Sequence, residues 1–291
     1  MNFNSIKLLL LKPVVIYLLA DILVKGMQFL LMPSASHLLS IQEYGKLTLF
    51  LALLTALVPM VSLSSESAYS IFYNQELGKN KKRLFINSIH VAGTGFVLFT
   101  LVTILLSFID DYLLFNIVSL KYQMTKMFWI VFLEYFVNLY LLSCRLSFDK
   151  TKYFFWFIFY FAMKFIVGLT SIYVFKSSDS YLNSILVLNI VFVFIIVSRF
   201  FKLTEFFKEV LSFDKKSYFR IVKYSAIILP VSVFSVVNSM VDKAYITSLL
   251  AVKELANYTS IFLLAGAIQI VILAMNLSLI HISEPTRHTR I

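Results

Sequence analysis

Residues 153–175 read YFFWFIFYFAMKFIVGLTSIYVF, and this stretch decides the fold class. It contains a single charged side chain, Lys164, in an otherwise apolar and aromatic run. A transmembrane helix needs about 20 mainly apolar residues to cross the hydrocarbon core of a bilayer. The stretch is therefore predicted to form one membrane-spanning helix.

The same criterion predicts seven further spans, near 13–36, 47–70, 85–108, 126–146, 182–201, 224–250 and 254–276. The composition agrees, because 60% of the 291 residues are hydrophobic and 14% are charged. A soluble chain has about 45–50% apolar and about 25% charged residues. We therefore predict an all-α membrane protein, a polytopic helical bundle with about eight transmembrane helices present.

The first span, 13–36, has a competing interpretation as a signal peptide cleaved near the small residues 33–36. Asp21 and Lys25 interrupt the apolar run where the core of a signal peptide should be most uniform. The interpretation favoured by these charges is a retained helix.

Basic residues predict how the chain is oriented. With the N-terminus in the cytoplasm, the inner segments hold 16 Lys and Arg and the outer segments hold 5. Positive residues collect on the cytoplasmic side of membrane spans. The formal net charge of +11 then serves as an orientation signal, and no nucleic-acid partner is expected.

The end of the chain has an unusual pattern. Residues 277–287, LSLIHISEPTR, resemble the translation of a transposon-derived sequencing adaptor, codon for codon. We therefore expect 277–291 to be non-native and the protein to be C-terminally truncated near Asn276. The histidines of this tail, His281 and His288, are accordingly not candidates for a metal site.

Two distant segments form a weak internal repeat at an offset of 211 residues. Residues 38–45, LLSIQEYG, align with residues 249–256, LLAVKELA, and Thr48 aligns with Thr259. Several transporter folds are built from such repeats, with the substrate site between the halves. A coincidence of apolar runs is the alternative.

These segments also carry a family resemblance. The stretch 38–50, LLSIQEYGKLTLF, with the Ser-rich end of the second span, resembles the start of bacterial polysaccharide flippases. Residues 229–258 resemble the start of the second lobe of that family, which belongs to the multidrug/oligosaccharidyl-lipid/polysaccharide exporter superfamily.

The resemblance implies twelve or more helices in two pseudo-symmetric lobes, in the bacterial cytoplasmic (inner) membrane. Residues 1–222 would form the N-terminal six-helix lobe with a cytoplasmic connecting loop. Residues 223–276 would supply the first two helices of the C-terminal lobe, and 277–291 the adaptor tail.

Polar residues inside the spans are the candidate site. An ionisable group at the centre of a membrane helix costs about 2.5–3.5 kcal/mol on insertion scales, so such groups usually face a cavity or a partner. The candidates for substrate binding are Lys25, Lys164, Lys243, Gln28 and Asn238. The candidates for charge tuning or for binding a coupling ion, a proton or sodium, are Asp21, Glu134 and Asp242.

The lysines predict an anionic ligand, because an ammonium is a compact point charge suited to phosphate. The structural alternatives are an i, i+4 pair between Asp21 and Lys25, and a lock between the lobes formed by Asp242 and Lys243. Lys164 has no acidic partner on its own helix, which favours a functional role.

The predicted function is translocation of a lipid-linked (prenyl diphosphate) oligosaccharide for cell-surface polysaccharide biosynthesis, by alternating access around a cationic cavity. No catalytic residue, metal or cofactor is expected, and the partners are this substrate, membrane lipid and a coupling ion. Two alternatives are a multidrug/ion antiporter of the same superfamily and a membrane-embedded oligosaccharide polymerase or glycosyltransferase. A truncated chain is not expected to transport.

Overall fold

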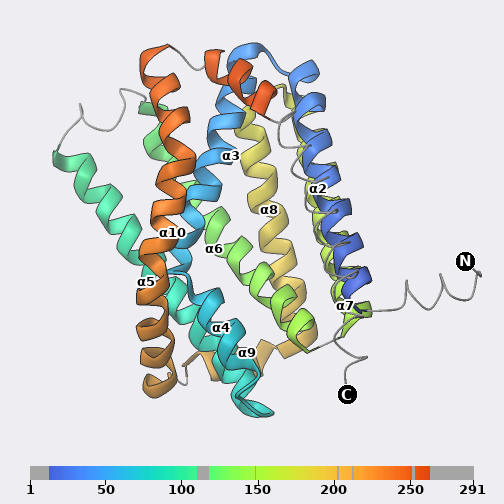
Figure 1. Ribbon diagram of the computed structural model, residues 1–291, viewed down its shortest axis with the longest axis vertical. Coiled ribbons are helices and arrows are strands. Elements are labelled where there is room, and N and C mark those ends of the chain that lie inside the picture. Colours follow the sequence, from blue (N-terminus) through green and yellow to red (C-terminus); the bar gives the residue numbers. More distant parts are fainter. Residues whose placement is uncertain are drawn as a thin grey trace, which may run out of the picture.

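The computed structural model describes residues 13–109, 118–147, 149–201, 203–211, 213–250 and 253–262, and this part of the chain is helical without strands (Figure 1). The long helices are α2 (Pro13–Leu38), α3 (Ile41–Ser62), α5 (Lys79–Ile109), α6 (Val118–Leu146), α7 (Lys150–Phe175), α8 (Ser178–Ile196) and α10 (Lys215–Leu249). Shorter elements are α4 (Ser65–Tyr73), α9 (Leu203–Leu211), a π-helical segment (Val197–Phe201) and a helical segment at 253–262.

Six of the described helices are long and apolar enough to cross a membrane: α3, α5, α6, α7, α8 with its π-helical extension, and α10. They correspond to the second through seventh predicted spans. Large apolar side chains on their outer faces are exposed, as Phe234 at 75% and Phe194 at 61% illustrate. Because water would penalise such surfaces, they indicate a lipid environment. The prediction of an all-α polytopic membrane protein is confirmed.

The remaining predicted segments are described in part. The first predicted span forms α2, a helix of 26 residues. The eighth, 254–276, is described only as far as Phe262, and the adaptor-like tail 277–291 lies outside the described residues.

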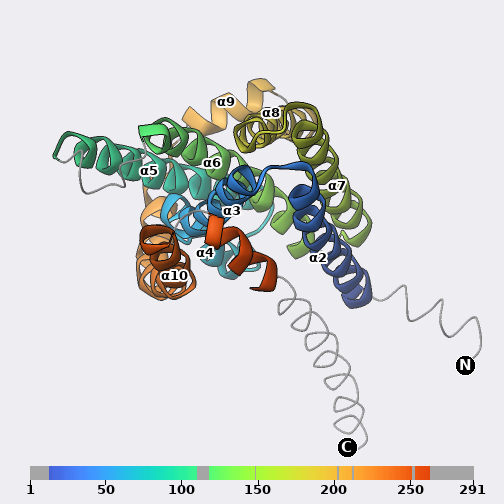
Figure 2. The ribbon, with the colours of Figure 1, turned by 90° about the horizontal axis from the view of Figure 1, so that it is seen from above.

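The helices pack as a bundle with two distinct flanks (Figures 1 and 2). On one flank α2 lies along α7, and on the other α10 lies along α3, α4 and α5. Between the flanks, α6 packs against α3 and α8, so these three helices form the centre of the bundle.

Buried apolar residues form two clusters, one toward each end of the bundle. One cluster includes Tyr69, Phe85, Tyr135 and Tyr160, and the other includes Phe50, Val131 and Ile172. On α6, Val131 belongs to one cluster and Tyr135 to the other. The level of the bundle between these residues is therefore where the two apolar cores meet.

The second predicted span, 47–70, is not one helix. It is divided between α3 and α4 by Leu63 and Ser64, which have left-handed φ values of 48° and 56°. Pro59 lies inside α3, which continues through it and ends at Ser62. At the break, the Ser62 hydroxyl accepts the Ser64 N–H (3.1 Å), which satisfies a backbone donor that the helix no longer pairs.

The basic loops gather at one end of the bundle. Arg220, in the first turns of α10, pairs there with Glu76 in the α4–α5 connection (2.8 Å). At the same end, the ammonium of Lys152 at the start of α7 lies 4.1 Å from the ring centroid of Phe200. These loops are the ones predicted to be cytoplasmic, and the fold places them at the same end of the bundle.

Candidate functional site: an ion pair inside the helical bundle

The most unusual feature of the described interior is a salt bridge between the central helix α6 and its neighbour α7. The Lys164 Nζ on α7 donates to Glu134 Oε1 on α6 at 2.7 Å, and the side chains are 19% and 20% exposed. Glu134 lies between Val131 and Tyr135, at the level where the two apolar clusters meet. The pair is therefore held midway along the bundle, remote from both ends.

A cavity of about 320 Å³ opens onto this pair. Five helices form its wall, and most of the lining is apolar. The contributions are Val24, Met27, Leu31 and Met32 from α2, Leu51, Leu54, Thr55 and Val58 from α3, Glu134 from α6, Phe161, Lys164 and Phe165 from α7, and Tyr181 and Ile185 from α8. Apolar walls strengthen the attraction between the two charges and any charge that enters.

A buried hydrogen-bond chain fixes the helices that carry the pair. The Tyr160 hydroxyl on α7 donates to Asn189 Oδ1 on α8 (2.8 Å), and Asn189 Nδ2 donates to the Ile130 carbonyl on α6 (3.3 Å). Tyr160 precedes Lys164 by four residues and Ile130 precedes Glu134 by four, so each anchor is about one turn from the ion pair. The chain therefore limits how far the two charges can separate.

Close packing of α7 against α8 sets one wall of the cavity. A Cβ atom on Gly168 would lie 2.6 Å from Cε2 of Tyr181, so only glycine leaves room for this ring. Gly168 is one turn from Lys164, and Tyr181 is 2% exposed. The absence of a side chain at position 168 is what allows the tyrosine ring to reach the cavity.

The structure brings two of the predicted site residues together and separates the others. Lys164 and Glu134 meet, although they lie on different helices. Lys25 is exposed on α2 and is not part of the cavity lining, whereas its neighbour Val24 is. Asp21 is half-buried, and neither residue takes part in an ion pair with another described residue. The side chain of Gln28 lies outside the described part.

The predicted residues of α10 lie elsewhere. Asp242 accepts a hydrogen bond from the Tyr258 hydroxyl (3.0 Å), and Lys243 donates to the Ser239 carbonyl (2.9 Å). Lys243 also lies 5.6 Å from the ring centroid of Phe262. Both charged residues thus contact the helical segment 253–262, the next one along the chain. Asn238 is exposed, and α10 packs on α3, α4 and α5 rather than on α7.

The sequence pattern did not single out Asn189, Tyr160 or Tyr181. Asn189 is the one of these with a visible signal, because an amide in the middle of the apolar run 182–201 needs a partner in a membrane. No group of three or more His, Cys, Asp and Glu residues suited to a metal ion occurs in the described ranges. Comparison with known protein families, curated proteins and solved structures finds no match to this chain.

Proposed function

We propose that this multi-pass membrane protein takes part in moving a lipid-linked oligosaccharide across the bacterial cytoplasmic membrane, with its N-terminus in the cytoplasm. The observation that carries the proposal is the Lys164 ammonium, held midway along the bundle at the edge of an apolar cavity. A prenyl diphosphate has a compact double anion beside an apolar chain. A lysine in an apolar wall is complementary to both parts.

The pairing with Glu134 sets the order of events. Lys164 can bind a phosphate strongly only if the phosphate replaces or joins the carboxylate as its acceptor. Once released, Glu134 would lie in an apolar wall without its cation, and an uncompensated charge there is costly. The carboxylate would then take up a proton or a sodium ion, so that anion binding and coupling-ion binding are linked at a single pair.

The experiment measures equilibrium binding of radiolabelled farnesyl diphosphate to the purified chain in detergent micelles. Lys164→Gln is expected to weaken binding at least about tenfold, as loss of a charge-assisted contact of about 1.4 kcal/mol or more requires. Glu134→Gln is expected to bind several-fold more tightly, because the phosphate no longer competes with the carboxylate. Lys82→Gln, an exposed lysine on α5, is the matched control.

Lys164→Gln leaves Glu134 unpaired, so the neutral double variant Glu134→Gln/Lys164→Gln completes the set. It should remain folded and should bind as weakly as Lys164→Gln. Wild-type affinity in either variant that lacks Lys164 would overturn the assignment. In a strain that depends for export on the protein with its C-terminal part restored, Lys164→Gln is expected to abolish lipid-oligosaccharide export without loss of the protein.

The same pair also supports the second candidate, a multidrug/ion antiporter, because Glu134 offers a carboxylate to a cation. The two functions differ in which member of the pair contacts the cargo. The antiporter would be favoured if the wild-type chain bound ethidium and had no affinity for farnesyl diphosphate, and if Glu134→Gln lost the binding of ethidium.

A further inference from the structure

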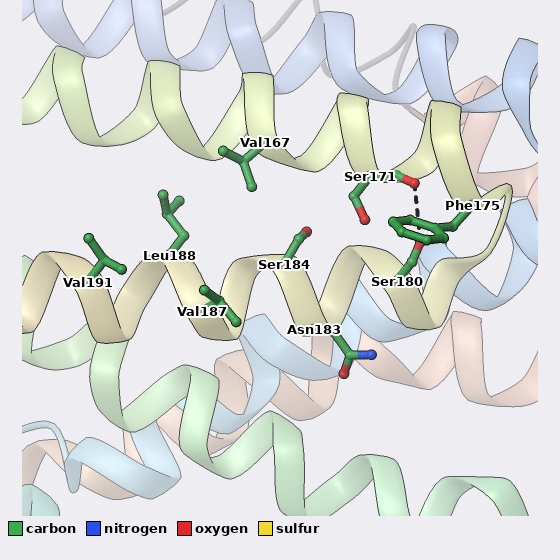
Figure 3. Close-up of a pocket in the computed structure, with 9 residues that line it drawn as sticks. All are labelled: Val167, Ser171, Phe175, Ser180, Asn183, Ser184, Val187, Leu188 and Val191. Atoms are coloured by element: carbon green, nitrogen blue, oxygen red, sulfur yellow. Dashed lines mark hydrogen bonds between the residues drawn. The ribbon is translucent and has the colours of Figure 1, made fainter.

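Among the described residues, a second hollow is lined by α7 and α8 alone, and Figure 3 shows it as a groove between the two helices. Its volume is about 550 Å³, and none of its lining residues lines the cavity at Lys164. The groove and the cavity are therefore separate sites that share a wall of two helices.

The groove changes in polarity along its length. Near the α7–α8 turn the lining includes the polar residues Ser171, Ser180, Asn183 and Ser184, together with the ring of Phe175. Farther along α8 it is lined by Val187 and Val191, which are 60% and 47% exposed. A membrane lipid has the same order of polarity, with a polar headgroup at the interface and chains directed toward the centre of the bilayer.

The polar end of the groove also carries positive charge. The Lys126 Nζ on α6 donates to Asn183 Oδ1 (3.0 Å), which leaves the Asn183 amide N–H groups without an acceptor among the described residues. Lys176, in the turn between α7 and α8, is exposed. The nearby carboxylate, Asp179, accepts a hydrogen bond from Gln123. The end of the groove therefore offers the amide donors of Asn183, next to the ammonium of Lys126 that this amide binds.

We propose that this groove binds one anionic phospholipid of the surrounding bilayer. The lipid phosphate accepts hydrogen bonds from Asn183 Nδ2 and from Lys126, and one acyl chain lies along Val187 and Val191. Basic pockets between transmembrane helices bind anionic headgroups in this manner. The site is independent of the proposed transport function, because its lining shares no residue with the cavity at Lys164.

The test is native mass spectrometry of the full chain, released from nanodiscs that contain equal amounts of phosphatidylglycerol and phosphatidylcholine with identical acyl chains. The wild-type chain is expected to retain phosphatidylglycerol about tenfold more than phosphatidylcholine. Asn183→Leu and Lys126→Gln should each lower this preference at least about threefold. Val187→Trp, which fills the apolar part of the groove, should reduce retention of both lipids.

Lys82→Gln removes an exposed cation at the opposite end of the bundle and should leave the preference unchanged. Each variant is first checked for wild-type thermal stability through the reactivity of the buried Cys144. Equal retention of the two lipids by the wild-type chain, or a wild-type preference in Asn183→Leu, would overturn the proposal. Displacement of phosphatidylglycerol by equimolar undecaprenyl phosphate would also overturn it, by assigning the groove to a prenyl carrier.

Discussion

Glu43 on α3 caps the start of α8, since its Oε2 accepts both the backbone N–H (2.8 Å) and the hydroxyl (2.7 Å) of Ser178. Its other oxygen, Oε1, pairs with Lys46 at 2.7 Å. The first N–H groups of a helix have no acceptor within the helix, and Ser178 is 1% exposed. A carboxylate from a neighbouring helix thus satisfies a donor that water cannot reach.

Glu43→Ala is therefore expected to destabilise the protein by about 1–3 kcal/mol, as loss of hydrogen bonds to a charged group generally does. Glu254→Ala is the matched control, because Glu254 aligns with Glu43 in the internal repeat at an offset of 211 residues. Glu254 is exposed, and among the described residues it accepts a hydrogen bond only from Asn257. Thermal unfolding can be followed with a thiol-reactive fluorogenic dye, since Cys144 is the sole cysteine and is 3% exposed. Equal midpoints for the two variants would contradict the capping role.

The ion pair makes a non-additive prediction. Removing one partner leaves an uncompensated charge in an apolar wall, which costs about 3–5 kcal/mol for buried pairs, whereas removing both charges is often nearly neutral. Glu134→Gln and Lys164→Gln should each lower the Cys144-reported midpoint, and the double variant should recover most of the loss. A double variant that loses the sum of the two single effects would mean that the charges are not coupled.

Gly168 supplies a steric prediction. Alanine at this position would place a methyl group 2.6 Å from the Tyr181 ring, so Gly168→Ala is expected to cost about 1–3 kcal/mol through overpacking. At Gly93 a new Cβ would meet nothing within 4 Å, so Gly93→Ala should be neutral or stabilising by up to about 1 kcal/mol. The same thiol assay distinguishes them, and equal midpoints would argue against close contact of α7 with α8.

Arg220 joins α10 to the rest of the bundle at its basic end. Its guanidinium carbon lies 4.0 Å from the Phe72 ring centroid, in addition to the ion pair with Glu76. Because Arg220 is partly exposed, Arg220→Ala should cost only about 1 kcal/mol. The change should also loosen the start of α10 locally and so accelerate trypsin cleavage after Lys215 and Lys216, its first two residues.

Lys223→Ala, an exposed position on the same helix, serves as the control for the protease experiment. Cleavage rates that rise equally in both variants would show that any loss of a basic residue has this effect, and would remove the specific role of Arg220.

Much of the fold could be predicted from the sequence because lipid imposes a simple length requirement. The runs of apolar residues in α5, α6, α7 and α8 were found nearly as the structure has them. The break at Leu63 and Ser64 could not be, because neither residue is glycine and nothing local indicates a left-handed backbone. Another helix approaches closely at the break, since a Cβ atom on Gly95 of α5 would clash with the Val61 carbonyl oxygen.

The candidate site could be predicted only in part, for a related reason. Helical periodicity identifies neighbours on the same helix, and it shows that Lys164 has no acidic neighbour on its own helix. It cannot show that Glu134 of α6 is the partner of Lys164, because the rotation of one helix against another depends on contacts such as those of Gly168 and Asn189. For the same reason, the shared helix faces of Asp21 with Lys25 and of Asn238 with Asp242 did not reveal which groups line the cavity.

The position of the Lys164–Glu134 bridge on consecutive helices has a consequence for how the protein is made. A lone lysine at the centre of a helix costs about 2.5–3.5 kcal/mol when that helix enters the bilayer. Because α6 is synthesised before α7, the carboxylate is already available when the lysine leaves the ribosome. The two helices can therefore enter the bilayer as a hairpin that is neutral at its centre, so that each charge lowers the barrier to insertion of the other.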